Sequence, residues 1–178
     1  EAIASGENTL PQMESKLDIS LGGYLKRLEE DYNIVTKKRP ILSKEGTQTV
    51  RYEIYDPFLR FWFRYFSKYQ SLLQIRNFKG LASIIKQDYP TYSGLLLEEY
   101  FRQKMMESGE FMDIGSWWEA KGNANEIDIV GIYLFEKKAL VAEVKRQRKN
   151  FKPELFQQKL EAIHKKVLFK YEMEAKCL

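Results

Sequence analysis

The sequence has very little cysteine and histidine: among 178 residues, Cys177 and His164 are the only ones of their types. A lone cysteine excludes an intrachain disulfide, and one Cys with one His excludes a zinc cluster. The apolar stretches are far shorter than the roughly 20 residues that span a bilayer, so we expect no membrane segment. No signal peptide is visible, and the sparing use of thiols fits a reducing compartment. We therefore expect a cytoplasmic protein.

Strong charge and a nucleotide-binding loop are also missing. The pattern Gly-x-x-x-x-Gly-Lys-Ser/Thr occurs nowhere, so the chain does not cradle nucleotide phosphates in that way. The net charge is only +4, from 29 basic and 25 acidic residues, which permits contact with nucleic acid without demanding it. What the chain does have is apolar material, 44% hydrophobic and 14% aromatic, enough to bury a core. No pattern points to a small-molecule substrate.

Residues 1–56 predict two helices joined by a short turn and followed by a β-hairpin. Thr9 is a good N-cap for the first helix and Ser20 for the second. This order is typical of a winged helix-turn-helix, whose second helix can enter the major groove of DNA. Lys26 and Arg27 on that helix are the candidate DNA contacts. Three consecutive acids follow them and repel phosphate, so a winged helix that serves packing or protein contact fits equally well.

Residues 57–90 predict a helical connector. Asp56 is a strong N-cap, and the proline after it suits the first helical position. The aromatic stripe that includes Phe58 and Trp62 is more typical of a core than of a ligand surface. A further helix is expected to stop at Pro90, because the residue before a proline disfavours helical geometry.

Residues 91–178 predict a small α/β/α domain with a mixed sheet, so the fold class of the whole chain is α+β. Alternating apolar residues predict the strands, and longer apolar periodicity predicts the helices. The expected elements are a helix over 91–108, strands over 111–118, 126–134 and 139–145, a helix from Pro153 to about Lys166, and a last strand over 171–177.

Three side chains in this second part form a candidate catalytic site. Glu143 and Lys145 are two apart in a strand and therefore point to the same face. If Glu136 and Lys137 form the hairpin turn, Asp128 falls opposite Lys145 on the neighbouring strand. Two carboxylates and one ammonium then share one face of the sheet.

That combination suits a magnesium-dependent phosphodiesterase. Asp128 and Glu143 offer the oxygen ligands that Mg²⁺ prefers, and Lys145 can orient water or stabilise charge on a phosphate. A further acid can assist from the preceding helix, where Glu98 and Glu99 are the candidates. The alternative is a surface ion pair on an edge strand.

The stretch after Lys145 is the most basic part of the chain. Arg146, Arg148 and Lys149 begin it, directly beside the candidate site. They could steer a phosphate backbone, although a solvated helix face is the commoner use of such charges.

Five segments together resemble a known family, and the resemblance covers nearly the whole chain. Residues 52–62 (YEIYDPFLRFW), 94–98 (GLLLE), 114–118 (IGSWW), 126–130 (EIDIV) and 142–145 (AEVK) resemble the C-terminal half of a family of archaeal and bacterial P-loop ATPases. In that family a winged helix and a PD-(D/E)xK nuclease-like domain follow the ATPase domain.

The resemblance implies a fragment of a larger protein. It places the nuclease-like acids on Glu98, Asp128 and Glu143 and the lysine on Lys145. It implies Mg²⁺ as the cofactor, ATP bound only by a domain upstream of Glu1, and DNA and that upstream domain as partners. The alternative function is a non-catalytic regulatory or binding module with the same fold, because a fold does not determine an activity.

Overall fold

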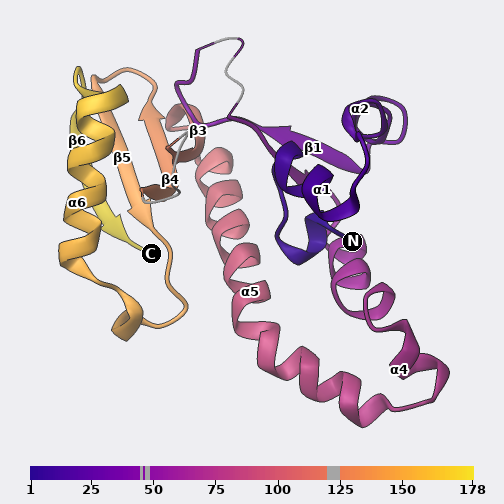
Figure 1. The fold of residues 1–178 in the computed structure, drawn as a ribbon. Coiled ribbons are helices and arrows are strands. Elements are labelled where there is room, and N and C mark those ends of the chain that lie inside the picture. The colour runs from indigo at the N-terminus through magenta and orange to yellow at the C-terminus, as the bar shows by residue number, and fades with distance from the viewer. Residues whose placement is uncertain (45, 47–48, 120–124) are drawn as a thin grey trace. The chain divides into compact units, whose positions relative to one another are not determined.

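The computed structural model describes residues 1–44, 46, 49–119 and 125–178. The chain divides into two compact units (Figure 1), the first comprising Glu1–Lys38 with Val50–Pro90 and the second Arg39–Thr49 with Thr91–Leu178. Turn-forming residues also predict a turn over 121–125, most of which lies outside the described residues. No helix in the described part of the chain has the length and apolar character needed to cross a membrane. The α+β class is confirmed.

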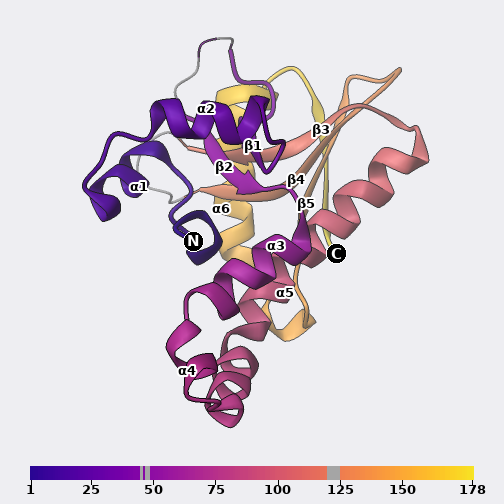
Figure 2. The same ribbon diagram turned by 90° about the vertical axis from the view of Figure 1, so that its right-hand side faces the viewer.

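The first unit begins with two helices and a two-stranded antiparallel sheet, in the predicted order (Figure 2). Met13, Leu25, Val35 and Tyr52 are buried together and form its core. The elements are a 3-10 turn (Ile3–Ser5), α1 (Leu10–Leu17), α2 (Gly22–Glu30), β1 (Val35–Lys38) and β2 (Arg51–Ile54).

The two helices begin in different ways. Thr9 and Gln12 form a capping box at the start of α1, as the sequence predicts for Thr9. The prediction that Ser20 caps α2 is wrong, because Leu21 holds the N-cap position without a side-chain hydrogen bond. Instead, the Glu14 carboxylate accepts a hydrogen bond from the Leu21 N–H at 2.8 Å, so α1 itself fixes the start of α2.

The connector of the first unit contains α3 (Pro57–Phe61), a π-helical turn (Trp62–Ser67) and α4 (Gln70–Gln74). Its predicted start is confirmed, since Asp56 accepts a hydrogen bond from the Leu59 N–H at 2.9 Å. The prediction that Phe58 and Trp62 are core is wrong: 67% and 44% of their surfaces are exposed. Tyr65, inside the π turn, is the aromatic residue of this segment that is buried.

The predicted stop at Pro90 is also wrong. α5 is one helix from Phe78 to Ser108, with Pro90 in its interior. A proline removes one helical N–H and crowds the preceding turn, which usually kinks or ends a helix. Here the helix continues, and the division between the two units falls at the peptide bond between Pro90 and Thr91.

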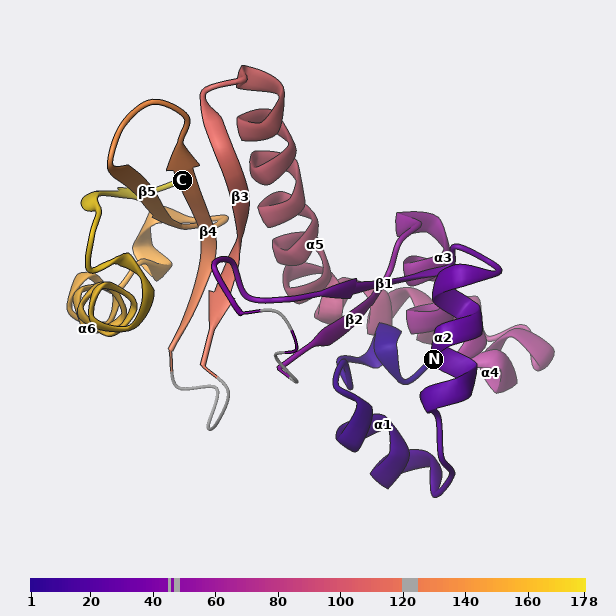
Figure 3. The ribbon, with the colours of Figure 1, turned by 90° about the horizontal axis from the view of Figure 1, so that it is seen from above.

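The second unit is built on a mixed sheet in the order β3–β4–β5–β6 (Figure 3). The first three strands are antiparallel, whereas β6 pairs with β5 in parallel after the helical crossover of α6. The predicted mixed sheet is confirmed. The elements are β3 (Phe111–Trp118), β4 (Glu126–Tyr133), β5 (Lys138–Glu143), a 3-10 turn (Arg148–Asn150), α6 (Pro153–Ile163), a π-helical turn (His164–Leu168) and β6 (Glu172–Cys177).

Helices cover both faces of this sheet (Figure 3). On one face, Phe156 and Leu160 of α6 pack with Val130 of β4. On the other, Leu97 in the second half of α5 packs against the cluster that contains Ile129. The two central strands, β4 and β5, are therefore nearly continuous runs of buried residues, as is usual for strands covered on both sides.

The pairing of β4 with β5 differs from the predicted register. Ile129 lies opposite Ala142, and continuing that register brings Asp128 level with Glu143 rather than with Lys145. The regular strand ends at Glu143, and the whole segment between Tyr133 and Lys138 makes the turn. A shift of two residues leaves every side chain on the face it had, so the expected grouping survives the error.

A pair of glycine substitutions tests the packing of the second unit. At Gly131 an added Cβ would lie 2.6 Å from the Phe111 ring, whereas at Gly94 in α5 it would meet nothing within 4 Å. We expect Gly131→Ala to destabilise the chain by about 1–3 kcal/mol through overpacking. Gly94→Ala should stabilise it by about 0.5–1 kcal/mol through helix propensity. Urea denaturation measures both, and equal effects would contradict the described packing.

Candidate functional site

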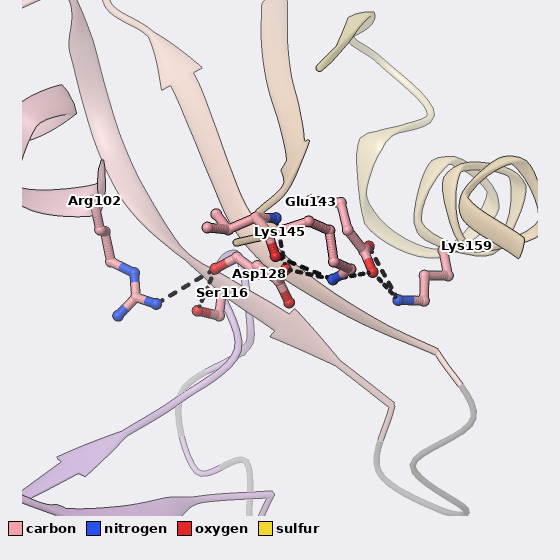
Figure 4. Close-up of polar contacts among 7 residues, drawn as sticks. Arg102, Ser116, Asp128, Glu143, Lys145 and Lys159 are labelled. Carbon is pink, nitrogen blue, oxygen red and sulfur yellow. Dashed lines mark hydrogen bonds and ion pairs between the residues drawn. The ribbon is translucent and has the colours of Figure 1, made fainter. Parts of the chain in front are cut away.

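The structure brings together the three residues that the sequence singled out on the two strands (Figure 4). The Lys145 Nζ lies 2.9 Å from Glu143 Oε1 and 3.5 Å from Asp128 Oδ2. The side chains of Asp128 and Glu143 are only 13% and 9% exposed. One ammonium therefore bridges two shielded carboxylates where β5 ends.

Asp128 is fixed from several directions. Its Oδ2 accepts a hydrogen bond from the Val144 N–H at 2.8 Å. Its main-chain oxygen accepts bonds from the Ser116 hydroxyl at 2.8 Å and from the Arg102 guanidinium at 3.4 Å, as Figure 4 shows. Within the described residues no hydrogen bond reaches the other carboxylate oxygen, Oδ1, so this atom is the one left for a ligand.

Lys159 of α6 completes the cluster, although the sequence pattern did not mark it as a site residue. Its Nζ donates to both oxygens of Glu143, at 2.8 and 3.0 Å. The helical spacing contained a usable signal: Lys159 directly precedes the buried Leu160 and is three residues after the buried Phe156. A lysine at the border of the buried stripe of a helix is a candidate partner for a buried acid.

The backbone after β5 is held by the end of β6. The Leu178 N–H donates to the Glu143 oxygen, and the Lys145 N–H donates to the Leu178 oxygen, both at 2.9 Å. These two bonds continue the parallel ladder past Cys177 and fix the direction in which Lys145 leaves the strand.

Glu98 approaches the cluster from α5, and its pKa is raised to about 8. Burial is the main cause, and the negative charge of Asp128 adds to it. Burial also raises the pKa of Asp128, against the Val144 hydrogen bond and the Lys145 charge, which lower it. Burial tends to lower the pKa of Lys145, but its two carboxylate partners outweigh this and raise it. The surroundings of Glu98 and Asp128 thus favour an added positive charge.

The chemistry of these donors suits a hard cation, but the protein offers few of them. No group of three or more His, Cys, Asp or Glu side chains that could hold a metal ion occurs in the described part of the chain. Asp128 and Glu143 supply two carboxylates, and Mg²⁺ commonly binds one or two such groups and keeps several waters. A phosphate brought to the same place would find the ammonium of Lys145.

The residues predicted to contact DNA are all exposed. In the first unit, Lys26 pairs with Glu30 at 3.7 Å and Arg27 with Asp31 at 3.6 Å, so nearby acids neutralise both. In the second unit, the basic segment Arg146, Arg148 and Lys149 directly follows Lys145. This basic segment is therefore joined directly to the carboxylate cluster along the chain.

Residues 62–171 match the family described as archaeal and bacterial proteins of unknown function, DUF234. The chain is also 32% identical over 157 residues to "Uncharacterized protein MJECL04" of Methanocaldococcus jannaschii. That alignment covers 82% of this chain but 34% of the relative, so the chain spans about a third of the length of the curated relative it matches. No solved structure matches the chain.

The raised pKa of Glu98 predicts how stability depends on pH. The folded chain holds this proton more tightly than the unfolded chain, so the free energy of unfolding falls as pH rises from about 4.5 towards 8. Glu98→Gln is neutral throughout. We expect it to have a higher Tm than the original chain at pH 9, without divalent cations, and no such advantage near pH 4.

Glu107→Gln is the matched control in the same helix, because the hydrogen bond from Lys104 lowers the pKa of Glu107. It should give no gain in Tm at pH 9. A Glu98→Gln advantage of the same size at pH 4 and pH 9 would show that the carboxyl of Glu98 does not titrate in this way.

Proposed function

The chain belongs to the DUF234 family of archaeal and bacterial proteins of unknown function, and we propose that its second unit is a Mg²⁺-dependent phosphodiesterase module directed at DNA. One observation carries the proposal: the Lys145 ammonium bridges Asp128 and Glu143 at the shielded end of two paired strands. Buried acids with raised pKa values beside a specific cation are more common at functional sites than on ordinary surfaces.

The order of elements supports the same proposal. A helix, three antiparallel strands, a second helix and a parallel fourth strand follow one another in the second unit. This is the kind of α/β/α arrangement that the likeness to PD-(D/E)xK nucleases implies. The acids and the lysine of that likeness lie on α5, β4, and at or just after the end of β5.

Each residue has a distinct role in this proposal. Asp128 and Glu143 hold the cation, which would make water a better nucleophile and offset charge on the phosphate. Lys145 orients the attacking water or stabilises the negative charge that develops on the phosphorus oxygens. Glu98 can keep a proton near neutral pH because its pKa is raised to about 8. Arg146, Arg148 and Lys149 guide the DNA backbone to the site.

The first unit serves as a winged helix in this proposal. Two helices and a β-hairpin in the right order support it. The acids paired with Lys26 and Arg27 weaken the electrostatic attraction between these two residues and phosphate. The matched relative is about three times as long as the aligned part, which leaves room for an ATP-binding domain of a cytoplasmic ATPase. The module would then act on DNA under the control of that domain.

A second candidate function is a non-catalytic binding or regulatory module. The observation that favours it is the neutralisation of Glu143 by Lys145 and Lys159. A carboxylate that already has two ammonium partners is a weaker metal ligand than a free one. In this version the basic segment binds DNA without cleaving it.

Nicking of supercoiled plasmid separates the two functions. We expect the chain to nick DNA with Mg²⁺ or Mn²⁺, and Asp128→Asn and Lys145→Met each to reduce the rate about 100-fold or more through loss of electrostatic stabilisation. Lys138→Met, at the other end of β5, is the control and should nick normally. Circular dichroism checks folding. Normal rates for both site variants would disprove the assignment of these residues.

DNA affinity at several salt concentrations tests the basic segment. The logarithm of the binding constant falls as the logarithm of the salt concentration rises, and each lost phosphate contact makes this slope less steep by about one. We therefore expect Arg148→Gln/Lys149→Gln to bind all sequences more weakly, with a slope reduced by about two. Asp128→Asn should leave that slope unchanged. A double variant that binds with the original slope would place the DNA surface elsewhere.

A further inference from the structure

Lys159 is too closely engaged with the candidate site to be only a surface charge. Its side chain is 12% exposed and that of Glu143 is 9% exposed. Its ammonium contacts both oxygens of Glu143, whereas Lys145 contacts one of them. Figure 4 shows the two lysines reaching Glu143 from different parts of the second unit, Lys145 from the segment just after β5 and Lys159 from α6. Removing one partner of such a buried pair leaves an uncompensated charge, so the ammonium is firmly held.

The position of Lys159 resembles that of a cation in a two-cation site. In such sites both cations share a carboxylate ligand and clamp the phosphate between them. Here Glu143 is the shared carboxylate, and Lys159 already satisfies both of its oxygens. Among the carboxylate oxygens of Asp128 and Glu143, Oδ1 of Asp128 is the one that accepts no hydrogen bond or ion-pair contact from the described residues.

The balance of charge leads to the same conclusion. The groups in direct contact balance in charge, Asp128 and Glu143 against Lys145 and Lys159. One divalent cation together with one phosphodiester would leave a single net positive charge, whereas two cations with one phosphodiester would leave three in a shielded place.

We propose that the Lys159 ammonium occupies the place of a second cation beside Glu143, so that the site takes one divalent cation together with a phosphodiester. This inference rests on the proposed function and adds the number of cations to it. Lys159 is a positioning residue in this scheme, because it acts through Glu143. Its positive charge determines how many divalent cations the site binds.

The test is the stoichiometry of Mn²⁺ binding to the whole chain, measured by titration calorimetry and by the electron paramagnetic resonance of free Mn²⁺. The number of Mn²⁺ ions that the double variant Asp128→Asn/Glu143→Gln still binds is subtracted from each stoichiometry, because exposed acids also bind Mn²⁺ weakly. We expect about one site-specific Mn²⁺ in the original chain and about two in Lys159→Met. Lys159→Arg keeps the charge and should return to about one. Lys165→Met, an exposed lysine just past α6, is the control.

Lys159→Met could fail to fold, since it leaves Glu143 with one partner fewer. Lys159→Gln then replaces it: the amide can still donate to Glu143 but has no charge, and we expect about two Mn²⁺. About one Mn²⁺ in either neutral variant, or two in the original chain, would overturn the role of Lys159 and leave the proposed function standing. No site-specific Mn²⁺ in the original chain would defeat both, and the plasmid assay reports on the proposed function independently.

Discussion

The alignment of β4 against β5 determines nearly everything else in the second unit. Ile129 lies opposite Ala142. Because side chains alternate between the two faces of a sheet, this pairing determines the face on which every other side chain of β4 and β5 lies. The apolar members fill the space under α5 and α6, and the polar members meet at the end where β5 stops. A slip by one residue would bury the carboxylates in those apolar layers, at a cost of several kcal/mol each. The core thus enforces the geometry of the site.

The same arrangement explains why the cluster is densely interconnected. A carboxylate as shielded as Glu143 is tolerated only with strong partners, and Lys145 and Lys159 provide them. Asp128 takes a backbone N–H and shares Lys145. Glu98, from a different element, has its acid form favoured by burial. Each group is therefore stabilised by a different means, and a bound cation or phosphate would change the balance among all of them.

Much of the second unit could be predicted from the sequence, because its strands and helices have strong periodicity and clear boundaries. The bounds of β3 are those expected, and the grouping of Asp128, Glu143 and Lys145 was expected as well. The register was wrong by two residues, because turn residues alone do not determine the length of a hairpin loop. The expected grouping survived only because the register error was an even number of residues, which leaves each side chain on the same face of the sheet.

Other features depend on tertiary contacts that local patterns do not contain. The contact from Lys159 to Glu143 joins residues 16 apart and depends on how α6 packs on the sheet. The start of α2 is fixed by Glu14 of the helix before it, so the preference of Ser20 for the N-cap position did not determine where α2 begins. The π turn after α3 is a further case, because no single residue in that segment signals the change from regular α-helical geometry.

The bonds between residue 178 and the end of β5 have a consequence for synthesis. Asp128, Glu143 and Lys145 leave the ribosome before the strand that secures them, because α6 and β6 follow them in the chain. Parallel pairing across such a crossover also forms late in folding, since its loop must close first. A nascent chain that ends before β6 therefore carries the polar residues without the hydrogen bonds that fix Lys145, and the cluster becomes ordered only once β6 has been made.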